Sequence, residues 1–353
     1  MNRKEEVLKA LKDRGDYVSG QSLSDMLGVS RTAVWKMITA LKKEGYMIES
    51  STNRGYRLME TPAFDPFNRQ EIEAQLHTGT IARNVFFLAE TGSTNEDAAR
   101  LSDEGAPHGT LVAAGMQKNG KGRRGRTWIS PAGTNTYFSL LLRPDIPAAS
   151  APILTLVSAV AAAKAIGELL RESRDDEGSV PCEAGIKWPN DIVVRRVLDP
   201  DGGWKKVCGI LTEMRLEDAQ IKDIIIGTGI NVNADTVPEE ITSSAASLKM
   251  MTGSRHPFDR AKLTASVMDN FEPLYERFIT EPSMRPFRDE YESLLVSRDR
   301  RVRVLDPAGE YEGLAVGIDD LGALKVIPDS APDGLPVLIS SGEVSVRGVE
   351  GYI

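Results

Sequence analysis

The stretch "SGQSLSDMLGVSRTAVWKMITALKKEG", from Ser19 to Gly45, decides the fold of the N-terminal part of the chain. Its apolar residues recur every three or four positions in two blocks, which predicts two amphipathic helices. The blocks are Leu23, Met26 and Leu27, followed by Val34, Met37, Ile38 and Leu41. Gly28 interrupts the pattern between them, and Ser30 is a typical N-cap for the second helix. A short helix, a turn with glycine and a longer basic helix are typical of a helix-turn-helix.

The residues on either side complete this unit. Upstream, apolar residues one helical turn apart predict a further helix that ends at Gly15. Downstream, "YMIESSTNRGYRLME" (46–60) predicts two short strands around a polar turn. Such a pair of strands forms the wing of a winged helix. We therefore expect a winged helix-turn-helix domain over residues 1–60.

The exposed side of the second helix is a candidate DNA-binding surface. Arg31, Thr32 and Lys36 lie toward the end of the helix that enters a major groove, and Arg54 at the hairpin tip would contact phosphate. Residues 1–60 carry a net charge of +3, whereas the whole chain carries −8, so the remainder is acidic. This asymmetry favours a polyanionic partner for the basic module. The alternative is a helical protein-interaction domain with a solvated basic face, but the order helix, turn, helix and wing favours DNA.

Composition predicts a globular protein of two or three domains, with 353 residues and 41% hydrophobic content. Two cysteines, Cys182 and Cys208, give no disulfide framework, and three histidines give little support to a metal site or a His-based triad. The charged start is not typical of a secretory signal. The apolar run Ala151–Leu170 is interrupted by Lys164, which favours a buried core helix over a membrane span. We expect a cytoplasmic protein that does not contact a membrane.

The rest of the chain divides by pattern. Thr61–Asn68 has two prolines and no periodicity, which predicts a linker. In residues 69–296, some segments repeat their apolar residues with the period of a helix and others with the period of a strand. Strands are expected at 85–90, 109–117, 135–144, 191–196, 205–216 and 223–233, and an amphipathic helix is expected at Asp259–Ile279. Residues 297–353 predict a small β-barrel-like domain of short strands. The predicted class is an α+β multidomain protein with an N-terminal winged helix-turn-helix, a central mixed α/β domain and a small C-terminal β domain.

The central domain contains a dense cationic loop, "GKGRRGRTW", from Gly120 to Trp128. Its glycines let backbone N–H groups approach an anion closely. Its cations are Lys121, Arg123, Arg124 and Arg126. The spacing of a Walker loop is absent, and no helix is expected to follow, which disfavours a dinucleotide-binding loop. The loop therefore predicts an anion-binding segment, with a nucleic-acid patch as the alternative.

A second candidate segment is "GIKWPND", from Gly185 to Asp191. Lys187 follows a short apolar segment and could contact phosphate as a compact charge. Asn190 has both donor and acceptor groups, which suits a base edge or a sugar. Pairing of the strands that follow could bring Lys206 near Lys187. Each lysine alone is more typical of a solvated surface residue.

Two further motifs combine small polar residues with element ends. In "TGSTNEDA" (91–98), the residues Ser93, Thr94 and Asn95 begin a helix after a strand. They could be plain N-caps, or hydroxyl and amide groups that bind a small polar ring.

In "GTGINVN" (227–233), Gly227 and Gly229 would let a flat ligand approach the backbone at a strand end. Asn231 is then a candidate adenine contact, and the alternative is a strand-end bulge.

Taken together, "TGSTN", "GKGRRGRTW", "KWPND", "KVCGILTE" and "GTGINVN" resemble, in this order and spacing, the motifs of the biotin protein ligase family. The N-terminal winged helix makes the chain similar to bifunctional members, which are also biotin-responsive repressors. The resemblance covers nearly the whole chain, and the set of motifs is highly specific although each motif alone is not.

The resemblance implies a two-step reaction. The biotin carboxylate attacks the α-phosphate of Mg-ATP to give biotinyl-5′-AMP and pyrophosphate, and a lysine of a biotin carboxyl carrier protein then attacks the anhydride and releases AMP. Cationic groups and Mg²⁺ would offset the repulsion between two anions. The cationic loop would fold over the hydrolysable intermediate and protect it. Biotinyl-5′-AMP would also be the corepressor, and a homodimer would bind operator DNA.

The resemblance also implies roles for individual residues. Ser93, Thr94, Asn95 and Gln117 would contact biotin; Lys121, Gly122 and Arg123 would line the closing loop; Lys187 would contact the phosphoryl group and Lys206 the biotin carboxylate; Arg126, Trp128, Asn190 and Asn231 would serve the adenylate side. The catalytic set is Lys187, Arg123 and Lys206. Lys121 departs from the family pattern, where arginine is usual, and lysine lacks the bidentate fork of arginine.

Two other functions are compatible with parts of the sequence. A regulator that senses biotin or its adenylate without turnover is disfavoured, because Lys187 and Lys206 are both present. A lipoate- or octanoate-type ligase on a related scaffold is disfavoured by the winged helix and by "KWPND".

Overall fold

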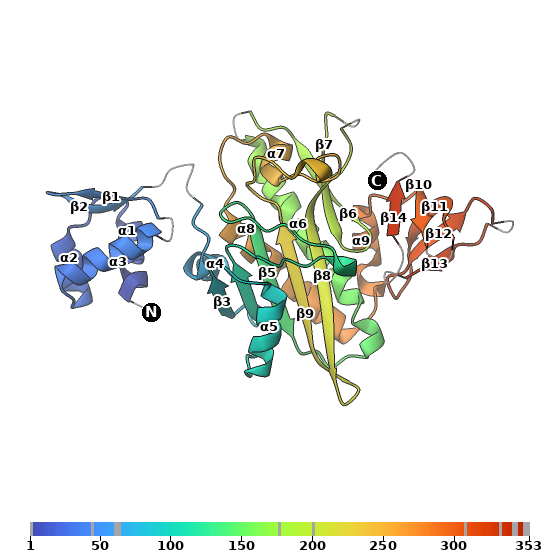
Figure 1. Cartoon of the computed structure of the whole chain (residues 1–353), viewed down its shortest axis with the longest axis horizontal. Helices are drawn as coiled ribbons and strands as arrows, with labels where there is room; N and C mark the ends of the chain where they lie inside the picture. Colours follow the sequence, from blue (N-terminus) through green and yellow to red (C-terminus); the bar gives the residue numbers. More distant parts are fainter. Residues whose placement is uncertain are drawn as a thin grey trace.

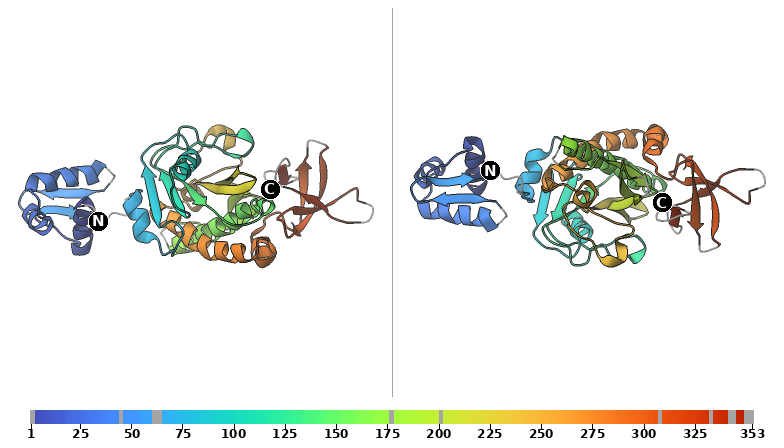
Figure 2. Two further views of the ribbon diagram at one scale, coloured as in Figure 1. Left: turned by 90° about the horizontal axis from the view of Figure 1, so that it is seen from below. Right: turned by 90° about the horizontal axis from the view of Figure 1, so that it is seen from above.

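The computed structural model describes residues 3–43, 46–59, 65–175, 178–199, 202–306, 309–331, 334–340 and 345–348. Three bodies follow one another along its long axis (Figure 1): a small helical unit, a large central α/β unit and a small β unit. Figure 2, which views the molecule from below and from above, shows the same linear arrangement. This architecture confirms the predicted fold class.

The N-terminal unit is the predicted winged helix. Its elements are α1 (Arg3–Arg14), α2 (Gly20–Leu27), α3 (Arg31–Lys43), β1 (Ile48–Ser51) and β2 (Gly55–Leu58). Gly28 ends α2 in the left-handed conformation, and the Ala33 N–H donates to Ser30 Oγ, as expected of an N-cap. On the predicted apolar face of α3, Val34, Ile38 and Leu41 are buried and Met37 is partly buried. Met26 of α2 is 56% exposed, because the buried side of that short helix is made by Leu23, Ser24 and Leu27.

The central unit is built on a seven-stranded sheet with the order β3-β4-β5-β9-β8-β7-β6. Its strands are β3 (Asn84–Leu88), β4 (Thr110–Ala114), β5 (Thr136–Leu142), β6 (Cys182–Lys187), β7 (Asp191–Arg196), β8 (Lys205–Glu217) and β9 (Gln220–Ile230). Only β3 and β4 pair in parallel among these described strands. All strands predicted in this region are present, with ends shifted by a few residues. Strand β6 was not predicted, because Glu183, Ala184 and Gly185 have low strand propensity.

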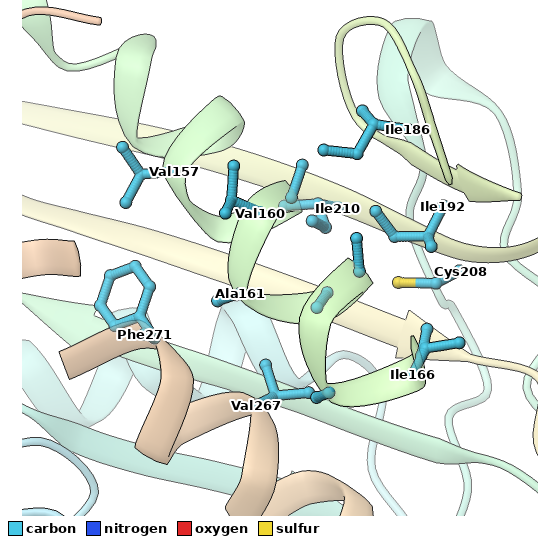
Figure 3. Close-up of a cluster of buried hydrophobic side chains, with 14 of the residues drawn as sticks. Val157, Val160, Ala161, Ile166, Ile186, Ile192, Cys208, Ile210, Val267 and Phe271 are labelled. Atoms are coloured by element: carbon cyan, nitrogen blue, oxygen red, sulfur yellow. The ribbon is translucent and has the colours of Figure 1, made fainter. Parts of the chain in front are cut away.

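Helices cover both faces of this sheet. They are α4 (Arg69–Gln75), α5 (Thr94–Asp103), α6 (Ile153–Glu172), α7 (Leu248–Thr252), α8 (Arg260–Thr280) and α9 (Arg288–Leu294). Alternate side chains of β5 show the division: Phe138 and Leu140 join the main core with α6 and α8, whereas Leu141 joins a separate cluster with α5. Figure 2 shows α6 and α8 together on one side of the sheet, and Figure 3 shows the core between them. The other face, under α5, is therefore where a ligand can reach the strands.

Helix α6 is the predicted core helix. Within the described chain, one segment, Ala148–Glu172, is long and apolar enough to cross a membrane, but 72% of its most apolar window is buried inside the fold. Figure 3 shows Val157, Val160 and Ile166 of this helix among core side chains. The apolar run is thus explained by packing.

The C-terminal unit is a five-stranded antiparallel sheet with the order β13-β12-β11-β10-β14. Its strands are β10 (Arg300–Leu305), β11 (Tyr311–Ile318), β12 (Leu324–Pro328), β13 (Val337–Ile339) and β14 (Ser345–Gly348). The expected small β domain is confirmed over its described part; residues 341–344 and 349–353 lie outside the described residues.

The predicted linker lies partly outside the described residues, at 61–64. Its described end is packed rather than exposed. The Asp65 carboxylate accepts from the backbone N–H of Arg260 at 3.0 Å and pairs with the Arg260 guanidinium, both side chains being buried. Arg260 also donates to the carbonyl of Asn135, and Asn135 Nδ2 lies 3.4 Å from Asn231 Oδ1.

A second buried contact joins the winged helix to the central unit. Glu71 of α4 accepts from Lys12 Nζ at 2.6 Å and from the Tyr46 hydroxyl at 2.6 Å. Asn68, the N-cap of α4, donates to the same hydroxyl at 2.9 Å. We call Lys12, Tyr46, Asn68 and Glu71 the interdomain network. It ties α1 and the segment between α3 and β1 to the first helix of the central unit.

Candidate functional site

One cavity of about 380 Å³ gathers every ligand-contact residue predicted from the sequence. They are Ser93, Thr94, Asn95, Gln117, Lys121, Gly122, Arg123, Arg126, Trp128, Lys187, Asn190, Lys206 and Asn231. Gly209 of β8 and Gly229 of β9 lie opposite each other in the sheet and both line the cavity. Segments far apart in sequence therefore meet on one sheet, as the motif set implied.

The start of α5 forms a polar wall. Ser93 occupies the N-cap position and is buried, but its side chain makes no capping hydrogen bond. Instead, Gln117 Oε1 accepts from the backbone N–H of Thr94 at 2.9 Å and from its hydroxyl at 3.1 Å. Side-chain capping by Ser93 is therefore not observed, and Ser93 lines the cavity together with Thr94 and Asn95.

The glycines of β9 make room for side chains that line the cavity. A Cβ on Gly227 would lie 2.2 Å from Asn95 Oδ1, and a Cβ on Gly229 would lie 2.4 Å from Trp128 Nε1. Both glycines also line the cavity, so the interpretation that a flat ligand approaches the backbone here stays a prediction. They admit Asn95 and the Trp128 indole, whose buried Nε1 has no hydrogen-bond partner among the described residues.

The cationic loop has a defined turn. The Gly122 N–H donates to the Arg126 carbonyl at 2.7 Å around a 3₁₀ turn, Arg123–Gly125, and no α-helix follows, as predicted. Arg124 has φ +59° and donates to Ser345 Oγ at 3.1 Å, so the loop contacts the C-terminal unit. Lys121 pairs with Glu96 of α5 at 2.6 Å. Hydrogen bonding to Glu96 raises the pKa of Lys121.

Arg123 joins the loop to the turn between β6 and β7. Its Nη1 donates to Asn190 Oδ1 at 3.0 Å, and the Asn190 amide donates to the Ile210 carbonyl at 2.8 Å. Burial lowers the pKa of Arg123, which Asp191 opposes. A guanidinium held in this partly buried position presents a strong anion-binding group to the cavity.

Lys187 and Lys206 meet beside Asp191. Lys187 lies opposite Asp191 in the strand register of the β6–β7 hairpin, and Lys206 Nζ lies 2.6 Å from Asp191 Oδ1. Burial is the main cause that lowers the pKa of Lys187 to about 7; the charges of Lys206, Arg347 and Arg126 act in the same direction, and Asp191 opposes them. The expected proximity of the two lysines is confirmed. Lys206 also lies over the Trp128 ring, 5.2 Å from its centroid.

Sequence reasoning missed Asp191, Ser345 and Arg347, which also line the cavity. Asp191 closes the "GIKWPND" motif, so a carboxylate beside a predicted phosphate-binding lysine was the available signal. Ser345 and Arg347 come from β14 of another domain, and no local pattern marks them.

The predicted DNA-contact residues are all exposed. Arg31, Thr32 and Lys36 are exposed on α3, and Arg54 lies in the turn of the wing with its guanidinium 4.2 Å from the centre of the Tyr17 ring. Trp35, also on α3, is 56% exposed. An indole this exposed, between cationic side chains, is typical of a binding surface.

A winged helix joined to an α/β domain with a cation-lined cavity defines a DNA-binding module fused to a domain for anionic ligands. The sequence pattern of the biotin/lipoate A/B protein ligase family matches residues 89–231, that of an HTH domain matches residues 3–57, and that of the biotin protein ligase C terminal domain matches residues 299–347. The chain belongs to the biotin/lipoate A/B protein ligase family.

Individual relatives extend over most of the chain. It is 38% identical over 311 residues to the bifunctional ligase/repressor BirA of Bacillus spizizenii, covering 88% of this chain and 89% of that one. It is 30% identical over 343 residues to the bifunctional ligase/repressor BirA of Escherichia coli, covering 97% of each. The solved structure of biotin protein ligase from Aquifex aeolicus in complex with biotin and ATP superposes with a TM-score of 0.61 at 30% identity, over 75% of this chain and 99% of that chain.

Proposed function

We propose that the protein is an ATP-dependent biotin–protein ligase and a biotin-responsive DNA-binding repressor. The observation that carries the ligase is the single cavity lined by the motif residues, with the cations of the loop facing Lys187 and Lys206. The repressor rests on the winged helix that the same chain carries.

The cavity chemistry suits adenylation of a carboxylic acid. A biotin carboxylate oxygen bonds to the α-phosphorus of ATP, the bond to the bridging oxygen breaks, and pyrophosphate leaves with that electron pair. Arg123, Lys187 and Lys206 stabilise the charge that develops on the phosphoryl oxygens. Trp128 and Asn231 serve the adenylate side, and Ser93 to Asn95 with Gln117 hold the ring of biotin.

The described residues contain no group of three or more His, Cys, Asp and Glu side chains that could hold a metal ion. This fits Mg²⁺ that arrives with the triphosphate, since Mg²⁺ keeps several waters and binds through substrate phosphates and one or two carboxylates. Asp191 is the carboxylate at the cavity that would lie nearest such an ion. When bound, the ion would neutralise phosphate charge.

In the second step, the amine of a carrier-protein lysine attacks the carbonyl of biotinyl-5′-AMP, an amide forms and AMP leaves. The cationic loop, which contains Arg123, keeps water away from the adenylate until the carrier protein binds. The same adenylate acts as corepressor. We infer that a homodimer binds a two-fold operator through Arg31, Thr32, Lys36 and Arg54, and that the protein works in the cytoplasm.

Ligand-dependent ATP–pyrophosphate exchange tests the ligase, with biotin, lipoate and octanoate measured separately. Exchange with biotin alone is expected. Exchange with lipoate or octanoate but not with biotin would support adenylation of a carboxylic acid and contradict biotin as the substrate. Binding of biotin without exchange would favour a sensor that does not turn over.

A further inference from the structure

A carboxylate outside the cavity lining contacts its polar wall. Asn95 Nδ2 donates to Glu213 Oε2 at 2.6 Å, and Ser139 Oγ lies 2.6 Å from Asn95 Oδ1. Ser139 is fully buried, and Asn95 is 5% exposed. Glu213 comes from β8 and Ser139 from β5, so side chains of two strands hydrogen-bond to one side-chain amide of α5.

The contact determines which way the amide faces. A carboxylate can only accept hydrogen bonds, so the nitrogen of Asn95, not its oxygen, must lie toward Glu213. The oxygen then lies toward Ser139, in the space that Gly227 leaves open, 2.2 Å from where a Cβ would be. The amide keeps a second N–H and a second lone pair for a polar ligand in the cavity.

We propose that Glu213 is a positioning residue for ligand recognition, which fixes the Asn95 amide so that its remaining donor and acceptor match the ureido ring of biotin. The inference rests on the proposed function, because the ureido ring is the polar ring of that substrate. Without the carboxylate, the amide can rotate by half a turn and exchange its donor and acceptor. Ground-state binding of biotin is then weakened, whereas the phosphate chemistry beside Lys187 is not.

Kinetics of biotin-dependent pyrophosphate exchange test this role. Glu213→Ala removes the acceptor, and Glu213→Gln keeps the shape while allowing either end to face Asn95. We expect the KM for biotin to rise about tenfold for Ala and less for Gln, with kcat and the KM for ATP little changed. Glu217→Gln, at the exposed end of the same strand, is the matched control and should leave all three constants unchanged.

A double-mutant cycle with Asn95→Ala separates positioning from general support. If Glu213 acts through Asn95, Glu213→Gln has little further effect on the KM for biotin in the Asn95→Ala background. An equal rise in both backgrounds, or an unchanged KM in Glu213→Gln with a lowered Tm, would overturn the proposal. A wild-type protein without biotin-dependent exchange would instead contradict the proposed function itself.

Discussion

At the scale of single residues, the cavity is an electrostatic arrangement prepared for an anion. Lys187, Lys206, Arg123 and Arg347 lie around the single carboxylate of Asp191 among the cavity-lining residues described. Without a bound anion these side chains carry a net positive charge. The buried amine of Lys187 therefore loses its proton easily, with a pKa of about 7. The site therefore exchanges protons when it is filled.

Adenylate binding is expected to take up a proton above pH 7. In the protein without ligand, Lys187 is largely neutral at pH 8, and a bound phosphoryl group favours its charged form and raises its pKa. Uptake should approach about one proton per ligand at pH 8 and vanish near pH 6, and affinity should decrease as the pH rises above 7. Calorimetry of biotinyl-AMP binding in buffers of different ionisation enthalpy measures the uptake. Lys187→Met should abolish it, and a buffer-independent heat in the wild type would contradict the prediction.

Arg123→Gly should accelerate loss of the adenylate without unfolding the protein. The substitution removes the hydrogen bond to Asn190 and a cation over the phosphoryl region. We expect the dissociation rate of biotinyl-AMP to rise at least about tenfold, as for loss of a charged hydrogen bond, with Tm nearly unchanged. Lys118→Gly, an exposed site just before the loop, serves as the control. A lowered Tm with unchanged retention would show that the loop is structural.

At the scale of elements, α3 carries two different kinds of contact group. Arg31→Ala with Lys36→Ala should weaken operator binding, because both residues are exposed cations. The slope of log affinity against log salt concentration should become shallower by about one unit per charge removed.

Trp35→Ala should weaken operator binding by about tenfold and leave that slope unchanged, because it removes apolar contact and no charge. Fluorescence anisotropy titrations at several salt concentrations distinguish the two. Ligation should be unaffected by either change; an unchanged DNA affinity would contradict the assignment of α3.

The elements also show how far sequence can predict this molecule. The sequence predicts helices well where apolar residues recur with a clear helical period, as in α3 and α8. It also predicts strands with runs of β-branched residues, such as β9. In both cases the local pattern agrees with the burial in the fold. Strand β6 was not, since its packing comes from neighbours rather than from its own residues. The motif residues of the cavity were predictable as a set. The contact of Glu213, which ends the motif "KVCGILTE", and the position of Arg347 were not, because they depend on strand register and on a contact between domains.

At the scale of the whole molecule, the interdomain network sets the orientation of the winged helix. Glu71 is buried and accepts from two groups of the other domain, so loss of its charge should release that domain. In Glu71→Gln, we expect the amides of residues 3–59 to show a shorter rotational correlation time than those of the central unit, measured by nitrogen-15 relaxation. In the wild type and in Glu73→Gln, a change at a neighbouring residue of α4, the two domains should show the same rotational correlation time. A common value in Glu71→Gln would contradict this role of the network.

The order in which the chain is made gives the cavity a further property. Ser345 and Arg347 line it from β14, whereas the motif residues begin at Ser93. During synthesis, a ribosome-bound chain therefore carries the motifs long before it carries the finished wall. A prematurely terminated chain that stops before β14 would fold its winged helix yet lack the complete enclosure for a reactive ligand. Such a fragment would lack Ser345 and Arg347 at the cavity, so on the proposed function it would hold the adenylate, and with it the corepressor, less well than the full chain.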